Sequence, residues 1–262
     1  MSAPFPTPVP AAADALAPRV PSARERVWAL IPCAGIGARA GNGTVPKQYK
    51  HLAGQPLVMH TLAAFAGVSR LRGGVVAVAA GDRFFDGRAV SPDGSWSVLP
   101  CGGATRAESV ANGLQALLAQ GADAGDWVMV HDAARCLVTT EQIDRLLDAC
   151  ASDDVGGLLA LPLADTLKTS HGGRVGATVD RAGKWLAQTP QMFRIGVLAH
   201  ALEAAGPVVT DESSAVEAAG LQPLLVTGSA LNFKVTWPED FALAEAVLEH
   251  RKRATTGLPS AE

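Results

Sequence analysis

The sequence has little of what several large classes of protein require. Only 18% of its 262 residues are charged, and the formal net charge is -3. This balance argues against a nucleic-acid-binding or membrane-surface protein, because both need a broad basic face. Any basic character must therefore be local and serve a small anionic ligand. No apolar segment approaches the roughly 20 residues that a membrane helix requires.

Cysteine is scarce and scattered. Cys33, Cys101, Cys136 and Cys150 form no C-x-x-C pair, and the chain has no H-E-x-x-H motif and no Cys/His cluster. Structural zinc needs such spacings, and disulfide frameworks belong mainly to small secreted domains. We therefore expect reduced, half-buried cysteines in a cytoplasmic protein, with no metal site built from its own side chains.

The two commonest phosphate-binding motifs are also missing, although a related loop is present. An apolar run, Val27–Ile31, is typical of a buried strand and leads into a loop with four glycines. From Gly35 the spacing is G-x-G-x-x-x-G, one residue longer than the dinucleotide fingerprint, and Lys47 has no Walker A context. Glycine lets backbone N–H groups approach an anion, which Arg39 and Lys47 can neutralise. The pattern A-G-x-G-x-R followed by P-K resembles nucleotidyltransferases that release pyrophosphate from a nucleoside triphosphate.

Alternating strand-like and helix-like segments predict the fold. Apolar runs indicate strands at 27–31, 75–80, 96–99, 127–130, 157–163 and 222–226. Helical patterns lie between them, one with Thr140 as its expected N-cap and the last with a capping box from Thr236 to Glu239. We expect an α/β, Rossmann-like single domain with a mostly parallel twisted sheet and helices on both faces. Ligands of such folds bind at the carboxyl ends of the strands.

The domain is expected to span residues 27–250. Residues 1–26 are rich in Pro and Ala and predict a flexible tail, and 251–262 form a polar C-terminal tail. There is no internal repeat and no linker to a second domain. Residues 164–190 break the alternation and indicate a projecting β-hairpin arm around His171-Gly172-Gly173. A lone two-stranded hairpin is marginally stable in water, so we expect this arm to pack on a partner subunit.

Nine blocks in register carry a family resemblance. They are I-P-C-A-G-I-G-A-R, P-K-Q-Y, G-G-A-T-R-A-E-S-V, V-H-D-A-A-R, D-T-L-K, T-V-D-R, L-A-Q-T-P-Q-M-F, V-T-D-E-S-S-A-V-E and N-F-K-V-T-W-P-E-D. Together they resemble the 2-C-methyl-D-erythritol 4-phosphate cytidylyltransferase family of the non-mevalonate isoprenoid pathway. The resemblance covers about Val27 to Glu249.

The resemblance implies a reaction between CTP and 2-C-methyl-D-erythritol 4-phosphate that gives CDP-methylerythritol and pyrophosphate. The implied cofactor is Mg²⁺, held mainly by the CTP phosphates. The attacking phosphate oxygen is already ionised at neutral pH, so no general base is needed, and the chain shows no Ser-His-Asp arrangement. The difficulty is electrostatic, because one anion must approach another. Positioned cations are the physical remedy.

The resemblance also implies roles for individual residues. The implied catalytic cations are Arg39, Lys47, Arg181 and Lys234. The implied nucleotide-binding residues are Cys33, Ala34, Gly35, Gly103 and Ser109, and the implied substrate-binding residues are Asp132, Arg135, Thr166, Thr189 and Thr210. In the family the hairpin arm crosses a two-fold axis, so Arg181 would serve the partner's site and the enzyme would be a homodimer.

Some positions depart from the family pattern or admit a plainer interpretation. Ala104 stands where the family commonly has an acidic residue, and Cys136 replaces its usual proline. We interpret His131 as a packed or hydrogen-bonded histidine rather than a catalyst. Asp211 and Glu212 look as much like the acidic first turn of a helix as Mg²⁺ ligands, so we leave them out of the site.

Plainer interpretations also exist for the cations. Lys47 could be a solvated surface lysine, and Arg181 a turn residue in a surface ion pair. Two other functions stay open at this point. One is a cytidylyltransferase of the same build acting on ribitol 5-phosphate. The other is a non-catalytic nucleotide-binding protein, which would not need four retained cations.

Overall fold

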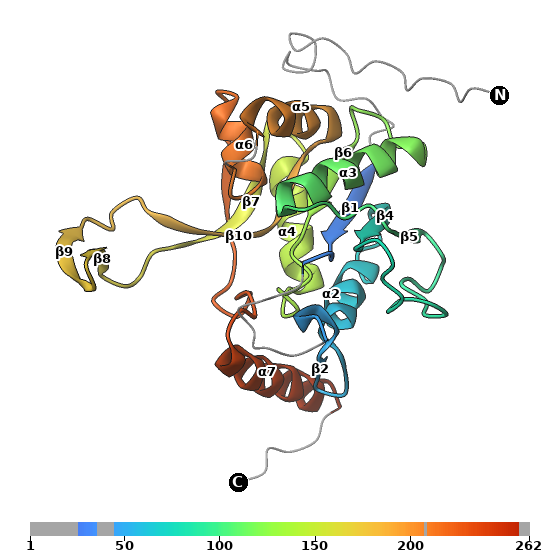
Figure 1. Cartoon of the computed structure of the whole chain (residues 1–262), viewed down its shortest axis with the longest axis horizontal. Coiled ribbons are helices and arrows are strands. Elements are labelled where there is room, and N and C mark those ends of the chain that lie inside the picture. Colours follow the sequence, from blue (N-terminus) through green and yellow to red (C-terminus); the bar gives the residue numbers. More distant parts are fainter. Residues whose placement is uncertain (1–25, 36–44, 207–208, 257–262) are drawn as a thin grey trace.

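The protein is described by a computed structural model that covers residues 26–35, 45–206 and 209–256 (Figure 1). Arg39, most of the proposed N-terminal tail and the last six residues lie outside this described part. A seven-stranded sheet with the order β11-β7-β10-β6-β1-β4-β5 forms the centre. Its strands are β1 (Val27–Pro32), β4 (Leu71–Ala77), β5 (Trp96–Leu99), β6 (Trp127–Val130), β7 (Gly156–Pro162), β10 (Trp185–Arg194) and β11 (Leu224–Thr227).

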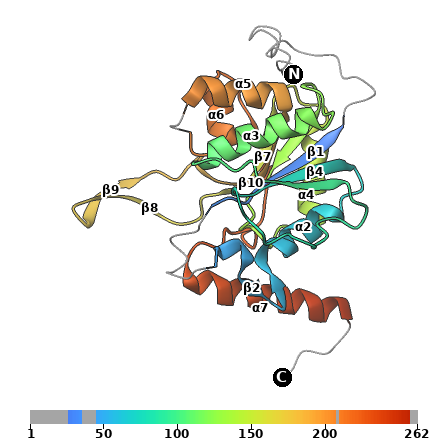
Figure 2. The same ribbon diagram turned by 45° about the vertical axis from the view of Figure 1, so that its right-hand side comes forward.

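Four of the six strand pairs are parallel, and β10 runs antiparallel to both of its neighbours. Helices cover both faces of the sheet (Figure 2). On one face lie α2 (Leu57–Ala66) and α4 (Thr140–Cys150), and on the other lie α3 (Arg106–Ala119), α5 (Ile195–Ala205) and α6 (Glu212–Ala218). A further helix, α7 (Pro238–Thr256), packs beside the sheet. The predicted α/β architecture is confirmed: one domain, a mostly parallel sheet and helices on both sides.

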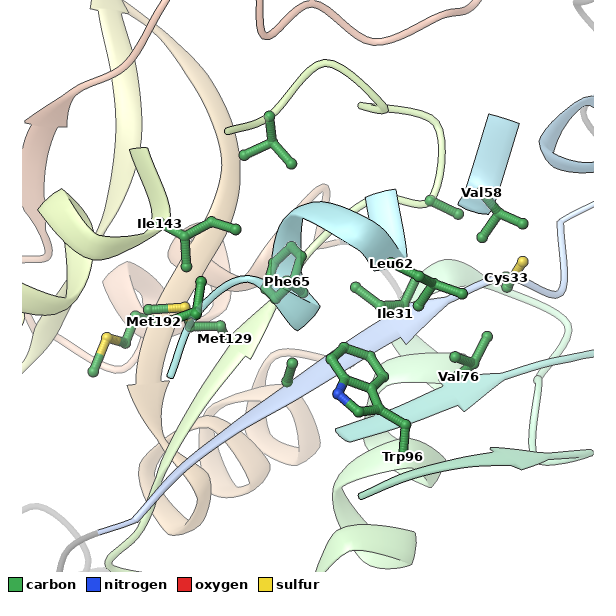
Figure 3. Close-up of a cluster of buried hydrophobic side chains, with 14 of the residues drawn as sticks. Ile31, Cys33, Val58, Leu62, Phe65, Val76, Trp96, Met129, Ile143 and Met192 are labelled. Carbon is green, nitrogen blue, oxygen red and sulfur yellow. The ribbon is translucent and has the colours of Figure 1, made fainter. Parts of the chain in front are cut away.

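Strand β1 shows how the sequence builds two cores. Ala29 and Ile31 face the cluster formed with α2 and α4, whereas Trp28 and Leu30 face the cluster formed with α3, α5 and α6. Successive side chains of a strand point to opposite faces, so a continuous apolar run places the strand between two helical layers. Figure 3 shows the first cluster, in which Phe65 of α2 lies among side chains from β1, β5 and β6.

A third apolar cluster lies beside the sheet. Helix α7 buries Ala244 and Leu248 against the short hairpin of β2 (His51–Leu52) and β3 (Gln55–Pro56) and against residues 134–137. Val235, just before α7, is fully buried in the same cluster, and its N–H donates to the Ala134 carbonyl. This packing fixes the segment that carries Lys234 beside the end of β6.

The sequence patterns do not predict strand β10, and β4 starts earlier than expected. The first three residues of β10 are exposed and the next six are buried, so neither alternation nor a uniform apolar run marks it. Gly73 and Gly74, which precede the strand predicted at 75–80, lie inside β4. The ring of Trp96 in β5 covers Gly74, and a Cβ there would lie 2.8 Å from it. Glycine at this position therefore makes room for the tryptophan.

Two helix caps are displaced from their predicted residues. Thr139, not Thr140, caps α4 by accepting from the Gln142 N–H, while the Thr140 hydroxyl donates to the Ala64 carbonyl. The predicted capping box from Thr236 to Glu239 is wrong as well. The carboxylate of Asp240 accepts from the N–H groups of both Thr236 and Trp237. Each displacement is a single residue, because adjacent polar residues compete for the same backbone donors.

A hairpin arm is present and stands away from the body in both views (Figures 1 and 2). It is shorter than the predicted 164–190, because the residues from Trp185 onward belong to β10, which pairs with β7 in the central sheet. The arm consists of β8 (Leu167–His171) and β9 (Arg174–Val179), which pair only with each other, and all residues of β8 are exposed. Val175 exposes 68% of its surface. All four cysteines are free thiols, and three of them are buried rather than half-buried. Within the described ranges, no helix is both long and apolar enough to cross a membrane.

Candidate functional site

A pocket of about 530 Å³ opens where β1 and β6 end. Its described lining comes from five chain segments: the loop after β1, the short 3-10 helix Lys47–Tyr49, the loop after β5 with the first turn of α3, the loop after β6, and the segment before α7. The lining residues are Pro32, Cys33, Ala34, Gly35, Lys47, Gln48, Gly103, Ala104, Thr105, Arg106, Ser109, Asp132, Ala133, Ala134 and Lys234. This is the edge at which ligands of open α/β sheets bind.

The first wall is held in place by Gln48. Its side-chain amide is buried and donates to the carbonyls of Cys33 and Gly35, each at 2.8 Å. Gln48 belongs to a short 3-10 helix, Lys47–Tyr49, so the start of the glycine-rich loop is tied to the segment that carries Lys47. Both carbonyl oxygens accept a hydrogen bond from this amide. Their partial negative charge is therefore partly compensated and repels an incoming anion less.

The second wall is the turn that begins α3. Ser109 accepts from the Gly103 N–H and donates to the Thr105 carbonyl, while Thr105 caps the helix by accepting from the Glu108 N–H. Glu108 in turn accepts from the Ala104 N–H at 2.8 Å. The N-terminus of α3, with its favourable dipole for anions, therefore lies at the pocket.

Asp132 joins the cations of the site. One carboxylate oxygen accepts from Arg106 Nε and the other from Lys234 Nζ, each at 2.8 Å, and Arg135 Nε lies 3.7 Å away. Burial by itself raises the pKa of Asp132, but the charges of Arg106, Lys234 and Arg135 outweigh it and hold the pKa well below its usual range. Asp132 is therefore ionised at neutral pH and keeps mutually repelling cations within one small volume.

Arg106 and Glu212 form part of the same network. From the sequence we did not single out Arg106, and we left Glu212 out of the site as a residue of an acidic helix turn. The Arg106 guanidinium donates to the two carboxylate oxygens of Glu212 at 2.5 and 3.0 Å. Burial lowers the pKa of Arg106, but Glu212 and Asp132 more than compensate and raise it above its usual range. Such bidentate pairs fix geometry as well as charge. The sequence does contain a signal for Arg106: this cation ends the G-G-A-T-R motif and is the first residue of the helix that follows the glycine-rich turn.

Hydrogen bonds of His131 and Thr189 hold the loop after β6 in place. The Thr189 hydroxyl lies 3.0 Å from the Asp132 amide and 3.1 Å from His131 Nδ1, and His131 Nε2 lies 3.1 Å from the Arg135 carbonyl. Burial lowers the pKa of His131 to about 3, with a smaller opposing effect of Asp132. The histidine is neutral, packed and hydrogen-bonded, as expected from the sequence.

Eight of the predicted site residues line this one pocket: Cys33, Ala34, Gly35, Lys47, Gly103, Ser109, Asp132 and Lys234. Lys47 Nζ donates to the carbonyl of Val235 at 2.8 Å, so the two predicted lysines approach the pocket side by side, although Lys47 and Val235 are 188 residues apart. This arrangement does not fit the interpretation of Lys47 as a simple surface lysine.

The remaining predicted residues lie beside or away from this pocket. Arg135 donates to the carbonyls of Asn232 and Ala187, and Thr189 is buried with its hydroxyl engaged. Thr166, Arg181 and Thr210 are exposed, and Arg181 contacts the carbonyl of Ala164 within its own arm. Arg39 lies outside the described residues. Thr166 and Arg181 are absent from the described lining of the pocket of their own chain.

The two departures from the family pattern are accommodated differently. Cys136 is buried in the cluster under α7, and burial raises the pKa of its thiol to about 12. It acts as a small apolar residue. Ala104 is exposed at the pocket edge, where Glu108 binds its N–H. An acidic group is thus present at this turn, although it is contributed by α3 rather than by position 104.

Comparisons with known proteins agree with the geometry. Residues 27–250 match the family model described as IspD, 2-C-methyl-D-erythritol 4-phosphate cytidylyltransferase. The 2-C-methyl-D-erythritol 4-phosphate cytidylyltransferase of Laribacter hongkongensis is 56% identical over 86% of this chain and 96% of its own. The bifunctional enzyme IspD/IspF of Albidiferax ferrireducens is 64% identical over 86% of this chain, which spans only 54% of that longer protein.

A solved structure shows the same fold. The crystal structure of a 4-diphosphocytidyl-2C-methyl-D-erythritol synthase is 39% identical, with a TM-score of 0.76, and the match covers 86% of this chain and 99% of that one. The region matched by the family model contains the whole sheet, the pocket and the arm. This chain belongs to the 2-C-methyl-D-erythritol 4-phosphate cytidylyltransferase family.

Proposed function

We propose that this protein joins CTP and 2-C-methyl-D-erythritol 4-phosphate to give CDP-methylerythritol and pyrophosphate, a step of isoprenoid precursor synthesis. One observation carries the proposal. Lys47, Arg106 and Lys234 come from three distant parts of the chain and line one pocket at the carboxyl edge of the sheet. A triphosphate and a phosphate nucleophile are both anions, so a pocket lined by cations suits the pair.

The reaction forms a bond between a phosphate oxygen of the polyol phosphate and the α-phosphorus of CTP, and breaks the bond from that phosphorus to the pyrophosphate. Lys47 neutralises charge that develops on the α-phosphoryl oxygens, together with Arg39. Lys234 draws the phosphate nucleophile towards the same point. No proton is removed by the protein, because the nucleophile is already ionised. Cations placed before the reaction avoid the cost of reorganising solvent.

The base and sugar of CTP are assigned to the other walls. Backbone groups of Cys33, Ala34, Gly35 and Gly103, with Ser109, surround the cytosine. The carboxylate of Asp132 faces the hydroxyl groups of the two substrates, and Arg135 and Thr189 support it from behind. Gln48 donates hydrogen bonds to the first wall and Ser109 accepts one from Gly103 in the second. Walls fixed in this way favour tight binding, because less ordering is needed when the nucleotide binds.

Mg²⁺ fits this site as a companion of the triphosphate. Asp132 is the one carboxylate in the described lining of the pocket, and both of its oxygens already accept from cations. Mg²⁺ is commonly bound through substrate phosphates with few protein ligands. Held by the CTP phosphates, the ion would neutralise charge on the triphosphate and on the departing pyrophosphate.

The arm supports a homodimer with shared sites. It exposes apolar residues and carries Thr166 and Arg181 away from the pocket of its own chain. In the proposed dimer Arg181 serves the site of the partner subunit, where it helps to hold the phosphate of the methylerythritol substrate. Thr166 and Thr210 belong to the same group of phosphate-binding residues. The substrates are small, soluble anions and the thiols are free, which suits a cytoplasmic enzyme.

A pyrophosphate-release assay tests the proposal. The purified chain is supplied with Mg²⁺, each of the four nucleoside triphosphates, and either 2-C-methyl-D-erythritol 4-phosphate or ribitol 5-phosphate. We expect turnover with CTP and the methylerythritol phosphate, and much less with any other combination. A preference for ribitol 5-phosphate would replace the substrate. Absence of pyrophosphate release in every combination would favour a non-catalytic nucleotide-binding protein.

A further inference from the structure

The turn that presents Asp132 is closed by a continuous chain of hydrogen bonds beneath the pocket. It begins at the Asp132 amide, passes through the Thr189 hydroxyl and the His131 ring, and ends at the Arg135 carbonyl. The first and last groups belong to the same short segment that follows β6. This series of hydrogen bonds therefore ties both ends of the segment to the imidazole of His131 and to Thr189 of β10.

The direction of each bond follows from the two end groups. The Asp132 amide can only donate, and the Arg135 carbonyl can only accept. His131 must therefore carry its proton on Nε2, and Nδ1 must accept the hydroxyl proton of Thr189. The Thr189 hydroxyl then accepts from the Asp132 amide and donates to Nδ1 of the ring. Every donor in this series of hydrogen bonds therefore has an acceptor. A protonated ring would leave Nδ1–H facing a hydroxyl whose own proton has no acceptor in this chain of hydrogen bonds.

The surroundings of His131 suit a fixed neutral ring. The side chain has no exposed surface and packs against the ring of Phe65, with centroids 5.1 Å apart. The charged groups that influence it are Asp132, Arg135 and Arg106. His131 is absent from the described lining of the pocket, so it touches the pocket only through the segment that it holds.

The segment held in this way bears the charge network of the site. Asp132 receives Arg106 and Lys234 on its two oxygens, and the Ala134 carbonyl accepts from the Val235 amide. A displacement of the Asp132 main chain would therefore move Lys234 as well. Lys47, which donates to the Val235 carbonyl, would lose its alignment with them.

We propose that His131 is a positioning residue: as a neutral Nε2–H imidazole it relays a hydrogen-bond chain that fixes Asp132, and through it Lys234, in the geometry that catalysis requires. The inference rests on the proposed function. It predicts that loss of the relay lowers turnover while the nucleotide walls, whose described lining does not include His131, keep their affinity for CTP.

Three substitutions separate the two halves of the relay. His131→Asn keeps an acceptor near the Thr189 hydroxyl, His131→Gln keeps a donor near the Arg135 carbonyl, and His131→Leu keeps neither. We expect His131→Leu to lower kcat roughly 10- to 100-fold, with the amide variants in between, while the Kd for CTP stays within about twofold. The melting temperature of each variant is measured alongside, and the amide variants decide the outcome if the leucine variant does not fold.

Nitrogen NMR reports which ring nitrogen of His131 carries the proton. A role of His131 in packing alone would not fix that position. The chain contains six histidines, so the His131 signals are identified by their loss in the His131→Gln spectrum. We expect one protonated and one bare ring nitrogen, unchanged between about pH 5.5 and pH 8.5, since burial disfavours the charged ring.

The outcomes are distinguishable. A ring that takes up a proton in that range, or that carries its proton on Nδ1, overturns the relay. An unchanged kcat in a folded His131→Leu chain, or a fall in CTP affinity equal to the fall in kcat, overturns the positioning role. Absence of pyrophosphate release in the unsubstituted chain would instead count against the proposed function.

Discussion

Asp132 shows how one residue can determine the charge of a site. It lies between three cationic side chains and remains ionised because their charges outweigh its burial. Without it, Arg106, Arg135 and Lys234 would repel one another at close range in a partly desolvated pocket. The carboxylate reduces this repulsion and leaves the pocket with an excess of positive charge for a phosphate ligand.

Lys47 offers a test of charge at the residue scale. If its ammonium acts mainly on charge that develops during the reaction, Lys47→Ala should lower kcat by roughly 10²–10³ and weaken CTP binding far less. Steady-state kinetics together with calorimetric titration of CTP check this. Lys50→Ala is the matched control, because Lys50 lies over the ring of Phe241 and outside the described pocket lining. Equal losses in kcat and affinity would make Lys47 a simple binding group.

Asp126 links pH to stability at the start of β6. Burial raises its pKa, but the Asp123 and Arg26 amides, the Trp28 indole and the Arg26 guanidinium outweigh this and lower it. A carboxyl whose pKa falls on folding stabilises the protein above its unfolded pKa, and this contribution is lost as the pH drops through the lowered value.

Asp126→Asn should therefore lower the free energy of unfolding by about 2 kcal/mol at pH 7, because donors to a charged acceptor lose their partner. The difference from the unsubstituted protein should shrink as the pH falls below about 4. Urea unfolding at several pH values measures it. Asp123→Asn, at an 83% exposed side chain, is the control and should cost under about 1 kcal/mol. A constant difference at every pH would contradict the assignment.

At the scale of elements, the pocket depends on how closely two loops approach. Gly102, after β5, lies against the loop after β1, and a Cβ at this position would lie 2.2 Å from the Cβ of Ala34 and 2.8 Å from the Val78 carbonyl oxygen. Neither neighbour is a flexible side chain. Glycine is needed here because of the close approach, and its φ is not in the left-handed region.

Gly102→Ala should separate the two walls, raise the Kd for CTP at least about tenfold, and lower the free energy of unfolding by roughly 1–3 kcal/mol. The double variant Ala34→Gly/Gly102→Ala removes one of the two clashes and should recover part of both losses. Nucleotide titration and urea unfolding provide the measurements. If the double variant binds CTP no better than Gly102→Ala, the contact between the loops is not the cause.

At the scale of the whole molecule, the arm is the element that a single chain leaves without support. Among the described strands, β8 and β9 pair only with each other, and all of their residues except Val179 are exposed. Two strands seldom persist in isolation. The proposed dimer gives the arm a surface to pack on and gives each pocket the arginine that its own chain places elsewhere.

Mixed dimers test this directly. Arg181→Ala and Lys47→Ala chains are each expected to be nearly inactive, but a mixed dimer holds one site with both residues intact. Random mixing of equal amounts should restore about a quarter of the unsubstituted activity, since half the dimers are mixed and half their sites are complete. Mass spectrometry verifies mixing. Verified mixed dimers without activity would show that Arg181 serves its own chain.

The sequence by itself determined the layers of the fold and much of the site. Short continuous apolar runs bounded by glycine indicated strands buried on both faces, and the helical spacing between them indicated a mostly parallel sheet. Loops that follow parallel strands meet at one edge, so the order of the elements along the chain was enough to bring Cys33, Gly103 and Asp132 together. The glycines and cations in those loops then indicated an anionic ligand.

The tertiary structure decided what depends on contacts between distant residues. Strand β10 carries no pattern of its own, because its surroundings change from solvent to core along its length. The pairing of Arg106 with Glu212 spans 106 residues, and the relay from Asp132 to His131 passes through a residue 57 positions away. Local sequence specifies periodicity and caps, whereas hydrogen-bond partners across the sheet are set by how the layers pack.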